Sequence, residues 1–215
     1  MTLPEVIPLF PLPSVVLFPR MPLPLHVFEP RYRAMVRDAV RGSRLIGMAL
    51  LRGDWQQDYD GRPEIFAEGT VGELAHVEEL PDGRFDIVLR GLRQFRIREE
   101  LPARAPYREA LVAWREPSHD PLPAGARAAV AGRVLRYLER LGRPTPENQL
   151  LESGIDDETF VNFLAQHLDL DALERQGLLE AATLAERARR LGDVLQFRLE
   201  ELRSHGTGRP GGRAH

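Results

Sequence analysis

The sequence predicts an α+β protein, in which a mostly antiparallel β-barrel with one inserted helix precedes a C-terminal helical bundle. Three observations lead to this class. Before residue 116, apolar residues form short runs bounded by proline and glycine, as strands do. After residue 123, apolar residues recur with the period of a helix. Between the two parts, residues 116–123 contain three prolines, which is typical of a linker.

Six short segments of the first part are predicted to be strands. The turn sequence LPDG at 80–83 is expected to close a long hairpin, because proline presets φ, aspartate caps the turn and glycine accepts a positive φ. Gly91 interrupts the alternation of the second hairpin strand, which indicates a β-bulge or a sharp bend. The predicted strands are residues 5–10, 23–28, 45–51, 70–80, 85–97 and 107–114.

One helix is predicted between the second and third strands. Pro30 takes a first-turn position, Glu29 precedes it as the N-cap and Gly42 follows the end of the pattern. We assign Glu29 to the helix cap, Arg31 to the surface of the first turn and Tyr32 to the core. None of the three is assigned to catalysis. A sheet of short strands with one packed helix favours a small closed or half-closed barrel. The apolar positions of the helix are Tyr32, Met35, Val36, Ala39 and Val40.

The second part is predicted to form three or four helices. Apolar stripes cover residues 130–141, 160–168 and 184–202, with a short helix between the last two. Thr183 and Glu186 have the spacing of a capping box. The predicted organisation is a barrel domain at 1–115, a linker at 116–123, a helical bundle at 124–205 and a disordered tail at 206–215.

The composition excludes several classes of enzyme. The chain has no cysteine, which removes disulfides, thiolate metal sites and cysteine nucleophiles. It also has no lysine, so a Walker A loop, a Schiff base and a Ser-Lys dyad are excluded. No histidine pair has metal-ligand spacing, and no serine lies in a GxSxG motif. The sequence therefore predicts no catalytic residue, no cofactor and no metal.

Charge and hydropathy indicate a protein of the cytoplasm. The net charge of −3 provides no overall field that would attract nucleic acid or an anionic membrane. Residues 1–6 lack the basic start of a secretory signal. Prolines interrupt the most apolar stretch, residues 6–28, so that stretch cannot form a spanning helix. No membrane contact is expected.

Blocks of sequence along the chain form an ordered pattern. They lie at residues 7–19, 22–35, 69–70, 80–84 and 90–97, and in the helical half at 160–168 and 185–189. In this order they resemble the Lon protease N-terminal, substrate-binding domain family, from about residue 7 to residue 203. Gln94 departs from the pattern, since family members often carry arginine at this position.

The resemblance implies both a fold and a function. It implies a PUA-like barrel carrying one helix, followed by a helical bundle. It also implies a module that recognises unfolded or exposed apolar polypeptide, as an adaptor in protein quality control. In Lon, the ATPase and the Ser-Lys peptidase lie downstream of this domain, so a free-standing, non-catalytic relative is expected. The implied partners are unfolded polypeptide and a protease or chaperone, and a homo-oligomer is left open.

Two segments are candidates for contact with peptide. The proline-flanked apolar run at 15–18 either binds peptide or fills the end of the barrel. The aromatic residues at 55 and 59 lie among polar residues, and they either anchor a ligand or fold back on the barrel. The candidate residues are Val15, Val16, Leu17, Phe18, Trp55 and Tyr59.

An RNA-binding barrel and a structural or oligomeric scaffold are the alternative functions. Residues 84–108 carry seven arginines against three acids, whereas residues 54–82 carry nine acids against one arginine. Because these segments are the two arms of the predicted hairpin, the opposite charges are most simply cross-strand pairs. Binding of nucleic acid is therefore the less favoured interpretation.

Overall fold

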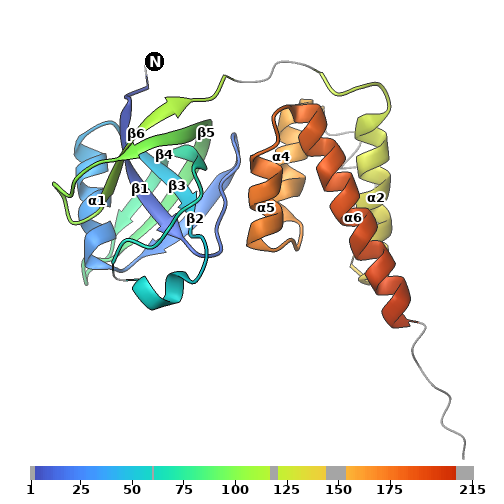
Figure 1. Ribbon diagram of the computed structural model, residues 1–215, viewed down its shortest axis with the longest axis horizontal. Coiled ribbons are helices and arrows are strands. Elements are labelled where there is room, and N and C mark those ends of the chain that lie inside the picture. Colours follow the sequence, from blue (N-terminus) through green and yellow to red (C-terminus); the bar gives the residue numbers. More distant parts are fainter. Residues whose placement is uncertain (1–2, 60, 117–120, 144–153, 207–215) are drawn as a thin grey trace, which may run out of the picture. The chain divides into compact units, whose positions relative to one another are not determined.

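The computed structural model describes residues 3–59, 61–116, 121–143 and 154–206 (Figure 1). In these ranges the chain forms a six-stranded sheet, a short 3₁₀ helix and five α-helices, which confirms the α+β class. No helix in these ranges is long and apolar enough to cross a bilayer. The elements are β1 (Val6–Leu12), β2 (Pro22–Val27), α1 (Pro30–Arg41), β3 (Leu45–Leu50), η1 (Trp55–Asp58), β4 (Glu68–Glu79), β5 (Phe85–Glu100), β6 (Arg108–Trp114), α2 (Ala126–Arg140), α4 (Asp157–His167), α5 (Ala172–Leu179) and α6 (Leu184–Gly206).

Strand pairing closes most of the sheet into a ring. β1 pairs with β3 and β6, β4 pairs with β3 and β5, and β5 pairs back onto β6. The β1–β3 pairing is parallel and the others are antiparallel, so the sheet is mixed. The parallel pair follows from the crossover through β2 and α1, because parallel neighbours need a long connection. β2 pairs with β5 alone and forms an edge.

A hydrophobic core fills the ring, with contributions from each strand that closes it. Phe95 of β5 is fully buried and meets the half-buried Trp114 of β6 edge-on, with ring centroids 6.3 Å apart. Outside the ring, Tyr32 of α1 packs its ring against Phe10 of β1 at a centroid distance of 4.3 Å. The buried core cluster comprises Ile7, Leu9, Leu45, Val71, Phe95, Ala110 and Val112.

The predicted irregularity at Gly91 is confirmed, because the β4–β5 register shifts next to it. The Gly91 N–H donates to the Met21 carbonyl at 2.9 Å, and the Arg20 N–H donates to the Gly91 carbonyl at 2.7 Å. A β-carbon at position 91 would overlap the backbone carbonyl oxygen of Phe18. The absence of a side chain at Gly91 therefore lets the loop after β1 lie directly on β5.

Contacts divide the chain into two compact units. The first comprises Met1–Ser118 and Asn162–Glu180, and the second comprises His119–Val161 and Ala181–His215. The first unit thus contains α5 and most of α4 as well as the sheet. The sequence predicted one bundle of all the later helices that packs on itself, with packing on the barrel left open. The linker predicted at 116–123 and the tail predicted at 206–215 fall largely outside the described residues and stay predictions.

Amide side chains explain why α4 and α5 belong with the sheet. Asn162 and Gln176 are buried, and each uses its amide to satisfy a backbone carbonyl of the sheet or its loops. Buried polar groups of this kind fix one arrangement, because an unpaired partner would be costly. The hydrogen bonds are Asn162 Nδ2 to the Pro19 carbonyl (3.1 Å), Gln176 Nε2 to the Glu68 carbonyl (3.0 Å), Gln94 Nε2 to the Leu179 carbonyl (2.6 Å) and the Phe18 N–H to Gln166 Oε1 (3.0 Å).

Candidate functional site

The two candidate segments leave the ring at the same end. Because β1 and β3 are parallel neighbours, their carboxyl ends lie together, and the Leu51 N–H donates to the Leu12 carbonyl at 3.0 Å. The loop 13–21 follows β1, and the segment 51–59, which contains η1, follows β3. We refer to residues 13–21 and 51–59 as the rim.

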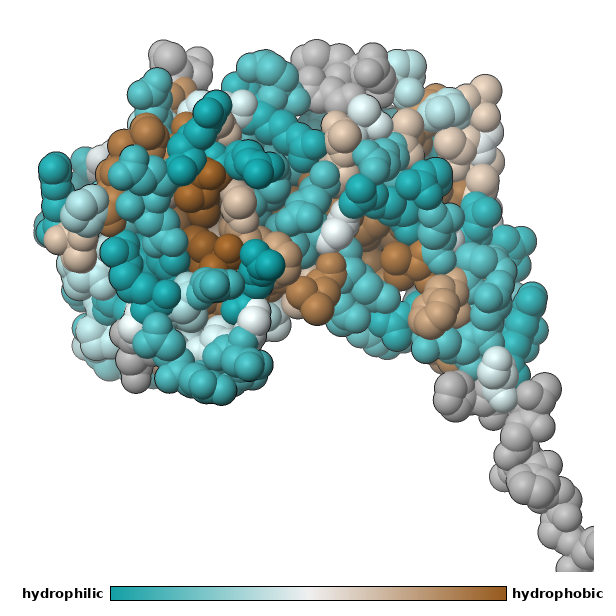
Figure 2. Space-filling view, in the orientation of Figure 1, coloured by the Kyte–Doolittle hydropathy of each residue, from teal (hydrophilic) through white to brown (hydrophobic). Residues whose placement is uncertain are grey.

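The apolar run of the rim lies mostly in the core. Val16, Leu17 and Phe18 are buried, with exposed fractions of 5%, 1% and 0%, and Val15 is half-buried. This placement agrees with the interpretation that the run fills the end of the ring. Only Val15 of the run presents part of its side chain to solvent, so contact of the run with peptide stays a prediction. Figure 2 shows a mostly hydrophilic face with scattered apolar side chains.

Trp55 and Tyr59 form an aromatic pair at the surface of the rim. Trp55 opens η1, and Tyr59 follows it with helical backbone angles, so the two side chains lie one turn apart. Their rings meet edge-to-face with centroids 5.8 Å apart, and both residues are half-buried. Each residue therefore rests on the protein while part of it remains accessible.

Glu29 and Arg31 hold Tyr59 in place. The Tyr59 hydroxyl donates to Glu29 Oε1 at 2.7 Å, and Arg31 donates through Nε to Glu29 Oε2 at 3.0 Å. Arg31 also donates to the Tyr59 carbonyl at 3.2 Å. Glu29 occupies the predicted N-cap position, and its side chain makes no capping hydrogen bond. The first-turn N–H groups of Tyr32 and Arg33 donate instead to the main-chain carbonyl of Glu29.

The electrostatics of this cluster keep both phenols protonated. The Arg31 guanidinium lies 4.7 Å from the Tyr32 ring centroid and 5.2 Å from that of Tyr59. Burial raises the pKa of the Tyr32 hydroxyl to about 12. Burial and the hydrogen bond to Glu29 raise the pKa of the Tyr59 hydroxyl above its ordinary value. Neither hydroxyl is available as a base near neutral pH, and the contacts of the cluster fix the Tyr59 ring beside that of Trp55.

Several arginines of the basic stretch 84–108 are paired with carboxylates. The pairs Arg90–Glu73 and Arg96–Glu68 join residues that face each other across β4 and β5, at 2.9 and 3.2 Å. Arg108 of β6 binds Glu100 through two hydrogen bonds, of 2.6 and 2.8 Å. These contacts agree with the cross-strand interpretation of the charge pattern, and they neutralise part of the surface that would have to meet phosphate.

Comparison with known proteins gives the family. Residues 6–196 match the family model of the ATP-dependent protease La (LON) substrate-binding domain. The chain belongs to the Lon substrate-binding domain family. This membership confirms the resemblance inferred from the sequence blocks. It also gives a context to Gln94, which here donates to the Leu179 carbonyl at the end of α5.

Curated relatives are Lon proteases that are much longer than this chain. Lon protease of Cytophaga hutchinsonii is 27% identical over 190 residues, covering 86% of this chain and 23% of the relative. Lon protease 2 of Herpetosiphon aurantiacus is 30% identical over 200 residues, covering 91% of this chain and 24% of the relative. The chain thus spans about a quarter of the length of these Lon proteases.

Solved structures of Lon N-terminal domains share the fold. The Lon N-terminal domain protein from Xanthomonas campestris is 30% identical and superposes with a TM-score of 0.64. The superposition covers 89% of this chain and 98% of that chain. The N-terminal domain of the Mycobacterium avium complex Lon protease is 17% identical, with a TM-score of 0.69 over the same shares. At that identity the second likeness concerns the fold alone.

Proposed function

We propose that the protein is a polypeptide-binding module that recognises unfolded or exposed apolar polypeptide through the rim and has no catalysis of its own. The observation that carries this proposal is the half-buried Trp55–Tyr59 pair, held on Glu29 and Arg31. Aromatic rings that are already fixed bury a large area with little loss of side-chain entropy. Val15 extends the same rim with an accessible aliphatic side chain.

Family membership supports this proposal, because the matching model describes a substrate-binding domain. The ring of strands with its inserted helix is consistent with a PUA-like barrel, which is the fold we propose for it. As an adaptor in the cytoplasm, the protein would hand bound polypeptide to a protease or chaperone. The absence of lysine supports the non-catalytic part of the proposal, since neither a Walker A loop nor a Ser-Lys dyad can be built in this sequence.

Loss of the Trp55 ring is expected to weaken capture of an unfolded polypeptide. The probe is a reduced and carboxymethylated protein, and binding is measured with the full chain immobilised. Because a central aromatic contact typically contributes 2 kcal/mol or more, Trp55→Ala is expected to raise Kd by about tenfold or more. Phe197→Ala on α6 is the matched control, because it removes an exposed aromatic ring outside the rim and is expected to bind like the wild type.

Wild-type affinity in Trp55→Ala, together with a clear loss of thermal stability, would show that Trp55 is structural and that the rim is not the binding surface. The dependence of the affinity on salt concentration distinguishes polypeptide binding from the alternative of an RNA-binding barrel. Phosphate contacts lose affinity steeply as salt rises, whereas burial of apolar polypeptide does not.

A further inference from the structure

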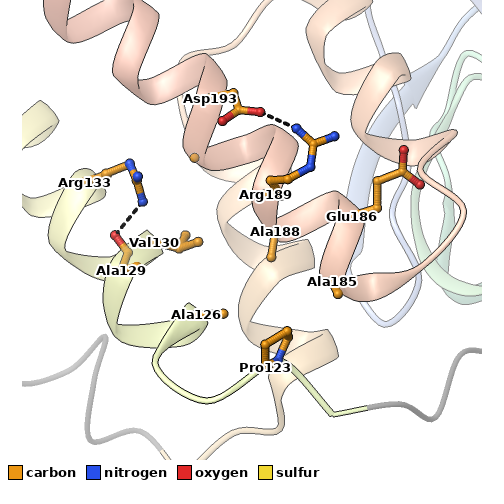
Figure 3. A pocket seen from close by; sticks show the side chains of 11 residues that line it. Pro123, Ala126, Ala129, Val130, Arg133, Ala185, Glu186, Ala188, Arg189 and Asp193 are labelled. Atoms are coloured by element: carbon orange, nitrogen blue, oxygen red, sulfur yellow. Dashed lines mark hydrogen bonds and ion pairs between the residues drawn. The ribbon is translucent and has the colours of Figure 1, made fainter.

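The second unit contains a groove between α2 and α6 with a volume of about 450 Å³ (Figure 3). Small apolar residues make up most of its surface. Val130 and Ala188 are buried in the floor, and Ala129 is exposed at the edge. The residues of the groove that matter here are Ala126, Ala129, Val130, Ala185, Ala188 and Gly192.

The charged residues around the groove leave one cation without a carboxylate. Arg189 pairs with Asp193 at 2.7 Å, and Glu186 pairs with Arg190 at 2.6 Å. Arg133 donates only to the carbonyl of Ala129 in its own helix, at 3.4 Å, and has no acidic partner in the part of the chain that the structure describes.

Arg133 lies at one end of the groove. A β-carbon at Gly192 would be 3.5 Å from its Nη1 and 3.7 Å from its Cζ, so the guanidinium lies across the glycine of α6. The groove thus combines an apolar floor with one positive charge that the described residues do not neutralise. An occupant that matches this surface has aliphatic side chains and one carboxylate placed beyond them.

We propose that this groove binds an amphipathic helix of a partner polypeptide, with aliphatic residues on its buried face and one acidic residue facing Arg133. The stretch from Ala126 to Arg133 spans about 10 Å at 1.5 Å per residue, which is about two helical turns. Small residues on both walls allow a third helix to approach closely. An extended peptide fits less well, because α2 and α6 use their own backbone groups and would leave those of the peptide unpaired.

This inference goes beyond the proposed function, which concerns the rim of the first unit. It assigns a second surface and a different class of ligand, namely a folded acidic helix rather than an unfolded chain. The two surfaces can therefore be tested with separate probes and separate variants of the same chain.

The first test fills the groove. The probe is a fluorescent, end-capped peptide of about 16 residues, long enough to form a helix, with leucines at helical spacing and one glutamate a turn beyond them. Ala129→Phe places a ring in the groove from an exposed helical position and is expected to weaken binding by about tenfold or more. Ala128→Phe, at the neighbouring exposed position outside the groove, is the matched control and is expected to bind like the wild type. Equal affinities of the two variants would overturn the proposal.

The second test reverses the charge. Arg133→Glu is expected to weaken binding of the glutamate peptide by about fivefold. The same variant is expected to bind more tightly than the wild type a second peptide in which lysine replaces the glutamate, since interfacial charge pairs control specificity. Equal responses of the two peptides would refute the role of Arg133.

Trp55→Ala should leave binding of the helical peptide to the groove unchanged. Capture of unfolded protein without any binding of the peptide would reject the groove while the proposed function stands, and the reverse result would reject the rim alone.

Discussion

Replacement of Gly91 by alanine is expected to lower the free energy of unfolding by about 3 kcal/mol. The added β-carbon would overlap the Phe18 carbonyl oxygen and lie 3.2 Å from the Cα of Pro19. Both neighbours are backbone atoms, so no change of side-chain rotamer can relieve the clash. The Gly91 N–H donates to the Met21 carbonyl and the Gly91 carbonyl accepts from the Arg20 N–H, so both bonds hold this loop against β5 and resist its displacement.

Urea unfolding followed by circular dichroism measures this effect. Gly132→Ala in α2 is the matched control, because no atom other than those of the adjacent residues and the nearby helix backbone lies within 4 Å of the added β-carbon. In a helix interior, this second change is expected to raise stability by up to about 1 kcal/mol. A Gly91→Ala protein as stable as the wild type would contradict the close contact between β5 and the loop after β1.

Replacement of the buried Asn162 by leucine is expected to lower the free energy of unfolding by about 2 kcal/mol, even though leucine is similar in size. The Asn162 side chain is fully buried, and its amide donates to the Pro19 carbonyl. Leucine cannot donate, so a buried carbonyl loses this partner. Adding Gln176→Leu removes the bond to the Glu68 carbonyl and is expected to destabilise the protein further.

Hydrogen exchange of the backbone amides shows which elements lose stability in this variant. If the side-chain amides of Asn162 and Gln176 hold α4 and α5 on the sheet, the backbone N–H groups of α5 should lose protection from exchange in Asn162→Leu before those of β4 and β5 do. Gln196→Leu on α6 is the control, because this exposed glutamine donates to Glu200 of its own helix at 2.7 Å and should change stability by less than about 0.5 kcal/mol. Unchanged protection of α5 in Asn162→Leu would show that the amide bond is dispensable.

The strands, the inserted helix and the main hairpin could be predicted from the sequence because their signals are local. In the turn at 80–83, Gly83 has a φ of 77°, and the Leu80 N–H donates to the Arg84 carbonyl at 2.8 Å. The predicted irregularity at Gly91 likewise rests on a break in alternation between neighbouring residues. Each of these features depends on a few consecutive side chains.

The grouping of α4 and α5 with the sheet could not be predicted in the same way. An apolar stripe has the same period whether it packs on helices or on a sheet. The deciding contacts join residues far apart in the chain, such as Asn162 with Pro19 and Gln94 with Leu179. The parallel pairing of β1 and β3 could not be predicted from the sequence either, because hydropathy does not specify which strands become neighbours.

The exposure of Trp55 and Tyr59 was left open by the sequence, and both residues are half-buried in the structure. The polar surroundings of the two rings contain no sign of Glu29, which is 30 residues away from Tyr59 in the chain. The local pattern placed Glu29 at the helix N-cap, where it lies, but did not indicate what its side chain binds. The carboxylate accepts hydrogen bonds from a guanidinium and a phenol, because hydrogen bonds to a charged group are the stronger ones.

The central claim, that the rim binds unfolded polypeptide, is tested most directly by the fluorescence of Trp55. The chain has two tryptophans, and the indole N–H of Trp114 has no hydrogen-bond partner among the described residues, so Trp114→Phe removes the second fluorophore without leaving a polar group unpaired. On titration of this variant with reduced, carboxymethylated protein, we expect a saturable blue shift of the Trp55 emission and reduced quenching by iodide. Saturable capture of the polypeptide with unchanged Trp55 emission and quenching would contradict the claim.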